Sequence, residues 1–237
     1  MTLLEVKNLA VTFDTETGPV EAVRGVSFSL GRERLGIVGE SGSGKTMTGR
    51  AVLRLIRPPG RITADRMMFD GQDLMAASER DMRALRGKRI GMVMQDPKYS
   101  LNPVMSVGDQ LTEGLRLRDG LGRRDAEAKA IAALEAVQIR DPARVLEAYP
   151  HELSGGMGQR VMIAMMLIPE PDLLIADEPT SALDVTVQAE VLSILDRLVR
   201  DRGMGLIFIS HDLRLVARFC DRVLVMYKGR VVEELQA

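Results

Sequence analysis

Residues 39–46 read GESGSGKT and match G-x-x-x-x-G-K-S/T, the pattern of a phosphate-binding loop. The loop follows a short apolar run, residues 35–38, and precedes a helical pattern over residues 45–56. Glycines let backbone N–H groups wrap around phosphate oxygens, and the following helix directs the positive end of its dipole at them. The sequence therefore predicts a phosphate-binding loop between a strand and a helix.

The end of this loop carries the two side chains that ATP with Mg²⁺ requires. Lys45 can reach the β- and γ-phosphates, and Thr46 offers its hydroxyl to Mg²⁺. A flexible loop that matches by chance is the alternative, but its place between a strand and a helix disfavours that interpretation. We expect ATP to bind through Gly39, Glu40, Ser41, Gly42, Ser43, Gly44, Lys45 and Thr46.

A second candidate region is LLIADE, residues 173–178, where an apolar strand ends in two carboxylates. Asp177 would help to hold Mg²⁺, through a water molecule, and Glu178 would position or deprotonate the attacking water. Taken alone, such a pair fits two solvated acids at a strand end. The phosphate loop upstream, on a comparable strand, supports the catalytic interpretation.

Gln95 and His211 also follow predicted strands, residues 90–94 and 206–210. Ligands of open α/β sheets bind at the carboxyl ends of the strands. We therefore expect Gln95 to contact both Mg²⁺ and the attacking water, and His211 to donate a hydrogen bond to the γ-phosphate. Taken alone, each residue also fits an ordinary loop or surface position.

The wider pattern predicts an α/β core with a mostly helical segment, residues 106–168, inserted in its middle. Helices are also expected over residues 184–202 and 213–219. The expected strands comprise residues 3–13, 20–30, 35–38, 62–69, 89–94, 173–176, 206–209 and 223–226.

Composition narrows the possible functions. The chain has 237 residues, 46% hydrophobic and 27% charged, with a net charge of −1, so disorder and a strongly basic nucleic-acid face are disfavoured. The single cysteine, Cys220, cannot form an internal disulfide and fits a reducing compartment. No signal peptide and no apolar run near the roughly 20 residues of a membrane span are present, so we expect a peripheral subunit if a membrane is involved.

The stretch LSGGMGQR, residues 153–160, resembles the signature sequence of the ATP-binding cassette (ABC) family. The order of motifs also resembles that family: phosphate loop, Gln95, signature, LLIADE, SALD at residues 181–184, then His211. This resemblance implies a P-loop NTPase fold with a mostly parallel core sheet, an N-terminal antiparallel β-subdomain and an inserted helical subdomain. The single domain would divide into a core, residues 1–95 and 170–237, and a helical subdomain, about residues 96–169.

In this family two cassettes pack head to tail, and each ATP lies between one phosphate loop and the opposite signature. The resemblance assigns the second cradle to Ser154, Gly155 and Gly156, where a hydroxyl, bare backbone and a helix dipole face an anion. Asp184 would communicate across the interface. Many family members have glutamine where this chain has Met157, but the backbone of Met157 can still contribute to the phosphate cradle. Phe13 is the best-placed residue to stack on adenine, or else a core aromatic residue.

Three further stretches resemble the ATPases of oligopeptide, dipeptide and nickel importers: residues 96–103, DPKYSLNP; residues 149–157, YPHELSGGM; and residues 177–192, DEPTSALDVTVQAEVL. This implies ATP hydrolysis that drives import of peptides or a related small solute. The implied partners are a second cassette, identical or different, membrane permease subunits and, indirectly, a solute-binding protein. The protein would lie at the cytoplasmic face of the membrane.

Members of that group usually carry a C-terminal region with clustered cysteines. This chain ends at Ala237, so we expect that region to be lacking, through truncation or as a natural short form.

Three other classes of protein fit this sequence less well. ABC ATPases that act on DNA split the cassette with long coiled coils, whereas Lys45 and Asp177 lie only 132 residues apart, without sustained heptads. Translation-associated members usually carry two cassettes and basic linkers. A regulatory module that binds nucleotide without turnover is disfavoured by Glu178 and His211. The transported solute cannot be read from the sequence.

Overall fold

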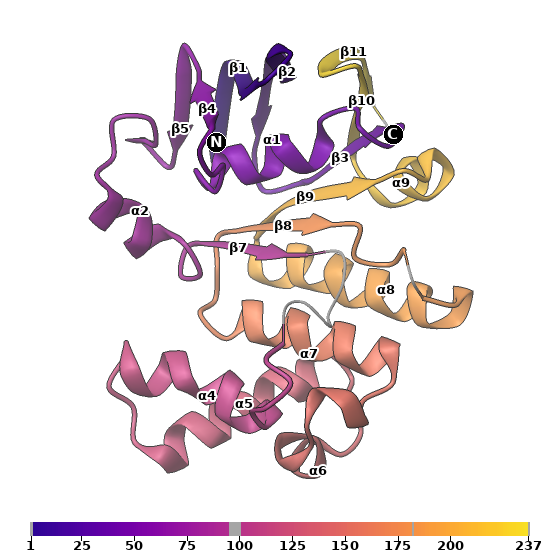
Figure 1. Ribbon diagram of the computed structural model, residues 1–237. Helices are drawn as coiled ribbons and strands as arrows, with labels where there is room; N and C mark the ends of the chain where they lie inside the picture. The colour runs from indigo at the N-terminus through magenta and orange to yellow at the C-terminus, as the bar shows by residue number, and fades with distance from the viewer. Residues whose placement is uncertain (1, 95–100, 182, 237) are drawn as a thin grey trace.

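The computed structural model describes residues 2–94, 101–181 and 183–236. It contains two β-sheets, with a helix between them, and a group of helices on the far side of the second sheet (Figure 1). Among these residues, no helix combines the length and the apolar character that crossing a membrane requires.

The first sheet is antiparallel and is built around β1, which pairs with β2, β4 and β5. Its core-facing positions alternate along β1, at Leu4, Val6, Leu9 and Val11, as expected for a sheet with one buried face. The strands are β1 (Leu4–Thr15), β2 (Gly18–Leu30), β4 (Gly60–Thr63), β5 (Arg66–Phe69) and β6 (Gln72–Asp73).

The single strand expected over residues 62–69 is instead two short strands, β4 and β5, and that prediction was wrong. Both pair with β1, but β1 is irregular between their contact regions: Asn8 has φ of 51°, and the register with β2 shifts between Val6 and Leu9. A continuous partner cannot follow such a bulge, so the segment breaks between Thr63 and Arg66.

The second sheet has six strands in the order β11-β10-β3-β9-β8-β7, all parallel except the edge strand β11. Every residue of β8 and β9 is buried, which explains their uninterrupted apolar sequences. The strands are β3 (Arg34–Gly39), β7 (Ile90–Val93), β8 (Leu173–Asp177), β9 (Gly205–Ser210), β10 (Arg222–Tyr227) and β11 (Arg230–Gln236).

Helix α1 (Lys45–Val52) follows the glycine-rich loop and packs against this sheet from the side of the antiparallel sheet (Figure 1). A Cβ at Gly49 would lie 3.1 Å from Ile175 Cγ2 and 3.2 Å from Ile209 Cδ1, so glycine lets α1 approach β8 and β9 closely. The helix is shorter than the expected 45–56, because Arg54 already has φ of 52°. A further helix, α2 (Glu79–Leu85), was not predicted and begins with a capping box at Ser78.

Between β7 and β8 the chain forms a helical body: α4 (Val107–Leu117), α5 (Arg123–Ala136), α6 (Pro142–Glu147), a 3-10 turn (Pro150–Glu152) and α7 (Gly155–Leu167). Two helices follow on the same side of the sheet: α8 (Val185–Arg202) and α9 (Leu213–Phe219). The expected architecture of a mostly parallel core sheet, an N-terminal antiparallel sheet and inserted helices is confirmed.

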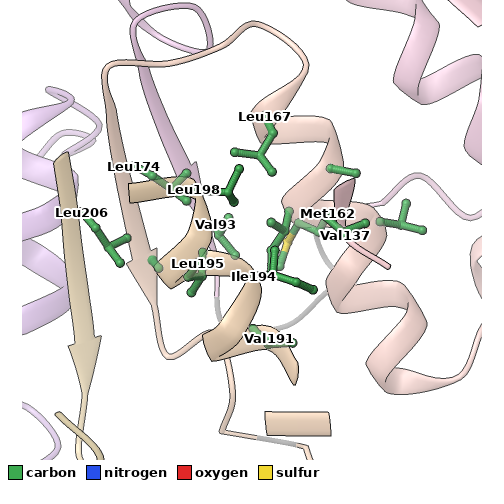
Figure 2. Close-up of a cluster of buried hydrophobic side chains, with 14 of the residues drawn as sticks. Val93, Val137, Met162, Leu167, Leu174, Val191, Ile194, Leu195, Leu198 and Leu206 are labelled. Atoms are coloured by element: carbon green, nitrogen blue, oxygen red, sulfur yellow. The ribbon is translucent and has the colours of Figure 1, made fainter. Parts of the chain in front are cut away.

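Helix α8 joins the helical body to the sheet through one buried apolar cluster (Figure 2). Met162 and Leu167 of α7 face Ile194 and Leu198 of α8 in this cluster (Figure 2). On the sheet side, the same cluster contains Val93, Leu174 and Leu206, from β7, β8 and β9. Because α8 contributes to both contacts, it links the helical body to the parallel sheet.

Candidate functional site: a phosphate-binding cleft

A cleft of about 460 Å³ opens where β3 ends and α1 begins. Residues from the loop, from β1 and β2, and from the ends of β8 and β9 line it. The lining residues are Phe13, Ala22, Ser41, Gly42, Ser43, Gly44, Lys45, Thr46, Met47, Glu178 and His211. The structure therefore brings most of the predicted loop residues together with two of the predicted catalytic residues.

Lys45 lies at the centre of the loop's own hydrogen bonds. Its Nζ donates to the carbonyl oxygens of Gly39, at 2.7 Å, and Glu40, at 2.9 Å. Burial lowers the pKa of this ammonium, against the opposing attraction of Glu178 and Asp177. The cation is thus held against the loop that we expect to bind phosphates, where phosphate oxygens can replace the two carbonyls as its partners.

Thr46 and Asp177 meet at the start of α1 and the end of β8. The hydroxyl of Thr46 donates to Asp177 Oδ1 at 3.0 Å, and Asp177 is only 4% exposed. Burial raises the pKa of this carboxyl, and the hydrogen bond from Thr46 partly opposes that rise. A hydroxyl beside a carboxylate is a donor set that suits Mg²⁺, which prefers oxygen ligands.

Within the described ranges, no group of three or more His, Cys, Asp or Glu side chains forms a metal site. Mg²⁺ typically takes one or two protein oxygens and completes its shell with water and substrate phosphates. Thr46 and Asp177 therefore fit a magnesium ion that arrives with a nucleotide, rather than a metal caged by protein alone.

Glu178 and His211 lie side by side in the lining of the cleft. His211 Nδ1 lies 2.9 Å from each of the two Glu178 carboxylate oxygens, and the glutamate side chain is 12% exposed. Sequence reasoning placed both residues near the γ-phosphate but missed this contact. It follows from the pairing of β8 with β9, in which Asp177 stands opposite Ile209, and neighbouring strands cannot be read from local sequence patterns.

The backbone of Glu178 has an unusual conformation. Its φ is 50°, in the left-handed region that residues other than glycine rarely adopt, and its N–H donates to the Ile209 carbonyl at 2.9 Å. Such a conformation costs roughly 1–3 kcal/mol and persists only where the surroundings hold it. It occurs here at a residue for which the sequence predicts a catalytic role.

Phe13 lines the cleft from the end of β1, and its stacking on adenine stays a prediction. Ala22 and Met47 also line the cleft, and sequence reasoning missed both. No sequence motif marks Ala22. Its carbonyl oxygen lies so close to Gly44 that a Cβ at Gly44 would be only 2.5 Å away, so the loop can pass β2 here only with glycine. Gln95 lies outside the described residues.

The predicted second cradle is not part of this cleft. Ser154 caps α7, where its hydroxyl oxygen accepts from the Met157 N–H at 3.3 Å, and it is exposed, as is Gly155. Asp184 caps α8 and accepts from the N–H groups of Thr186 and Val187, both at 3.0 Å. One chain thus presents a phosphate loop and a separate, exposed helix N-terminus.

A glycine-rich strand–loop–helix unit, with Thr46 hydrogen-bonded to the aspartate at the end of another apolar strand of the same sheet, defines the class of P-loop nucleotide-binding proteins. The ABC transporter family model matches residues 23–181, and the chain belongs to this family. The family expected from the signature sequence is confirmed.

The most similar relatives include two peptide transport proteins. Over 98% of its length, the chain is 51% identical to the oligopeptide transport ATP-binding protein OppD of Bacillus subtilis, and it covers 65% of that protein. It is 48% identical to the dipeptide transport ATP-binding protein DppD of Escherichia coli, again over 98% of its own length and over 72% of the relative's. The chain thus spans about two thirds of the length of these relatives.

Among solved structures, the bacterial ABC transporter cassette MJ0796, determined as a dimer, matches with a TM-score of 0.87 and 25% identity. The match covers 98% of both chains. A second structure of that cassette, in a post-hydrolysis state bound to ADP and Pi, matches equally well. The fold of the present chain is therefore that of an ABC cassette.

Proposed function

We propose that this chain binds and hydrolyses ATP to drive import of peptides, or a related small solute, through a membrane permease. The observation that carries the proposal is the convergence of Lys45, Thr46, Glu178 and His211 on one cleft, with Asp177 hydrogen-bonded to Thr46. The names of the two relatives support peptides as the solute.

In this mechanism the loop N–H groups and Lys45 bind the phosphates. Thr46 and Asp177 would hold Mg²⁺, which would supply positive charge next to the phosphates. Glu178 accepts a proton from, or orients, the attacking water. His211 turns from Glu178 to the γ-phosphate as a hydrogen-bond donor. Phe13 stacks on the adenine ring.

The site is completed in this proposal by a second cassette, whose Ser154, Gly155 and Gly156 cover the γ-phosphate while Asp184 contacts the opposite subunit. The exposure of Ser154, Gly155 and Asp184 supports this arrangement. The other partners are permease subunits, reached at the cytoplasmic face of the membrane, and indirectly a solute-binding protein.

The test of the nucleotide site is Lys45→Ala, with Lys129→Ala, an exposed lysine of α5, as the matched control. Removing the cation that binds β- and γ-phosphates should abolish tight ATP binding or turnover, measured as phosphate release by protein purified free of contaminating ATPases. Lys129→Ala should match the wild type. If Lys45→Ala hydrolysed ATP at the wild-type rate, the assignment of the loop would be wrong.

Import is tested with the chain reconstituted in proteoliposomes with its permease and solute-binding protein. Peptides should stimulate ATP turnover, and peptide uptake should stop in Lys45→Ala. Stimulation by a sugar or a metal ion, and not by peptides, would reject the proposed solute.

The permease is proposed to dock in the groove between the α/β core and the helical body, around residues 96–114. Residues 96–100 lie outside the described ranges, but Val104, 80% exposed, and Met94, 40% exposed, present apolar side chains near it. A cysteine at Val104 should cross-link to the permease if the permease docks here. The native Cys220 should not react, because it is buried and its pKa is raised to about 12, so any cross-link reports the introduced cysteine. Cross-linking instead from Val20→Cys, on β2, would place the permease elsewhere.

A further inference from the structure

The turn that joins Glu178 to α8 is held by a hydrogen bond from the helix itself. Gln188 lies in the first turns of α8, and its Nε2 donates to the hydroxyl oxygen of Thr180 at 3.2 Å. Thr180 is only 5% exposed, so this bond is largely shielded from water. A shielded hydrogen bond constrains its partners more than one exposed to solvent does.

The hydrogen bond from Gln188 holds Thr180, which lies next to the residue that contacts the Glu178 carbonyl. The N–H and the hydroxyl of Ser181 both donate to the Glu178 carbonyl, at 3.3 Å and 3.2 Å. Thr180, between them in the chain, accepts from the Leu183 N–H through its own carbonyl at 3.2 Å. Moving Thr180 would therefore disturb the contacts that hold the Glu178 carbonyl.

Glu178 needs such support because its φ of 50° is unfavourable for a residue with a side chain. On its N-terminal side, the Glu178 N–H is fixed by the β9 carbonyl of Ile209. On its C-terminal side, the turn is tied to α8 by Gln188 and, further along, by Asp184, which caps that helix.

We infer that Gln188 is a positioning residue for ATP hydrolysis: its hydrogen bond to Thr180 holds the turn that keeps the Glu178 carboxylate in place in the cleft. This inference rests on the proposed function. Gln188 does not line the cleft, so it acts through Thr180 and the backbone of Glu178. It also makes α8, which packs against the helical body, a direct support of the hydrolytic site.

The inference separates turnover from ATP binding. Lys45 and Thr46 lie on α1, and their hydrogen bonds go to Gly39, Glu40 and Asp177, without a contribution from α8. Loss of the Gln188 bond should therefore lower kcat and leave the KM for ATP nearly unchanged. A displacement of about 1 Å at a reacting group can cost on the order of 10²-fold in rate.

The experiment compares steady-state ATP hydrolysis by Gln188→Leu and Gln188→Glu, with Ser193→Ala, exposed on α8, as the control. Leucine keeps a similar size and loses the donor, so kcat should fall about 10–100-fold with KM within about twofold. Glutamate restores the bond in the opposite direction, because its carboxylate can accept from the Thr180 hydroxyl, and most of kcat should return.

A double-mutant cycle with Thr180→Val tests the pair itself. Thr180→Val should reproduce the fall in kcat, Thr180→Ser should retain activity, and Gln188→Leu with Thr180→Val should fall no further than either single variant. Unchanged kcat in Gln188→Leu would overturn the inference. A lower kcat, a higher KM for ATP and a lower Tm, all to the same extent in Gln188→Leu and Gln188→Glu, would also overturn it, because this pattern indicates a general structural role. A wild-type chain without ATPase activity, even with its permease, would instead reject the proposed function itself.

Discussion

Two neighbouring carboxylates, Asp177 and Glu178, have different surroundings at the end of β8. Asp177 is 4% exposed and faces Thr46, and burial raises its pKa. Glu178 reaches the cleft and meets His211. Burying a carboxylate near a second carboxylate lowers the stability of the fold. Asp177 therefore destabilises the nucleotide-free chain, although the same carboxylate is proposed to hold Mg²⁺.

We predict that Asp177→Asn raises the Tm of the nucleotide-free chain at neutral pH. Because the folded pKa of Asp177 is raised above its usual 3.8, the stability penalty is absent below that value and grows as the pH rises through the folded pKa. Asparagine removes the charge and can still accept from Thr46. The Tm should rise by roughly 2–4 °C for each kcal/mol of this penalty that the substitution removes. Thermal unfolding at a series of pH values should show the gain vanish as the pH falls towards 3.8.

The matched control is Asp65→Asn, in the exposed turn between β4 and β5, which should show no such pH-dependent gain. With ATP and Mg²⁺ present, the order of stability should reverse, because the wild type binds this ligand pair more tightly and is stabilised more by it. A Tm of Asp177→Asn that stays below the wild-type value at every pH, without nucleotide, would contradict the prediction.

At the scale of elements, the N-termini of α7 and α8 are packed so closely that only glycine fits between them. A Cβ at Gly156 would lie 2.6 Å from Val187 Cγ1, whereas a Cβ at Gly155 meets nothing within 4 Å. The signature glycines thus have two different surroundings: Gly155 faces open space and Gly156 contacts α8. Because Asp184 caps the N-terminus of α8, this contact joins the proposed phosphate cradle to the residue proposed to contact the opposite subunit.

We predict that Gly156→Ala destabilises the fold, although alanine usually stabilises a helix relative to glycine by up to ~1 kcal/mol. The clash with a branched, stiff side chain should cost about 1–3 kcal/mol, measured by urea unfolding. Gly155→Ala is the matched control and should be neutral or stabilising. Adding Val187→Ala should recover most of the loss in Gly156→Ala, and failure to recover it would show that the helix contact is not its cause.

At the scale of the whole molecule, the proposed active site is divided between two surfaces of the chain. The cleft carries the phosphate loop, while Ser154, Gly155 and Asp184 are exposed elsewhere. The dimeric structure of the similar cassette MJ0796 supports a pairing of two cassettes here. ATP would then join the two subunits, and its hydrolysis would loosen them.

We predict that Glu178→Gln forms a stable dimer with ATP and Mg²⁺. The amide keeps the size of the side chain and loses the ability to take a proton, so hydrolysis should fall ~10²–10⁴-fold while ATP still binds. Light scattering should show a dimer with ATP and a monomer with ADP. The wild type should stay monomeric because it consumes ATP without a permease to hold the pair.

The control for this assembly is the double variant Lys45→Ala with Glu178→Gln, which should remain monomeric because it lacks the phosphate contact. A Glu178→Gln chain that stays monomeric at saturating ATP would speak against a homodimer and favour pairing with a different cassette. Normal hydrolysis by Glu178→Gln would remove this residue from the proposed catalytic role.

The amino-acid sequence by itself determined the family, the phosphate loop and the buried strands. These features are local in the sequence. In GESGSGKT the glycines, the lysine and the threonine stand at the fixed spacing that lets a loop wrap around phosphates. Strands β8 and β9 are continuous apolar runs because both faces of the sheet are covered. Strand β11 was missed because its sequence, RVVEELQ, does not alternate regularly between apolar and polar residues and most of it is exposed at the sheet edge. Its pairing with β10 depends on a turn at Lys228 and Gly229, both with positive φ.

Only the tertiary structure decided which distant residues meet. Glu178 and His211, 33 positions apart, touch because β8 and β9 are neighbours in the sheet, and Gln188 reaches Thr180 because α8 folds back beside the turn that precedes it. These contacts depend on strand order and helix packing, which the burial of apolar surface sets across the whole chain. Local sequence patterns identify which residues carry the chemistry, but the packing of the elements sets the distances between them.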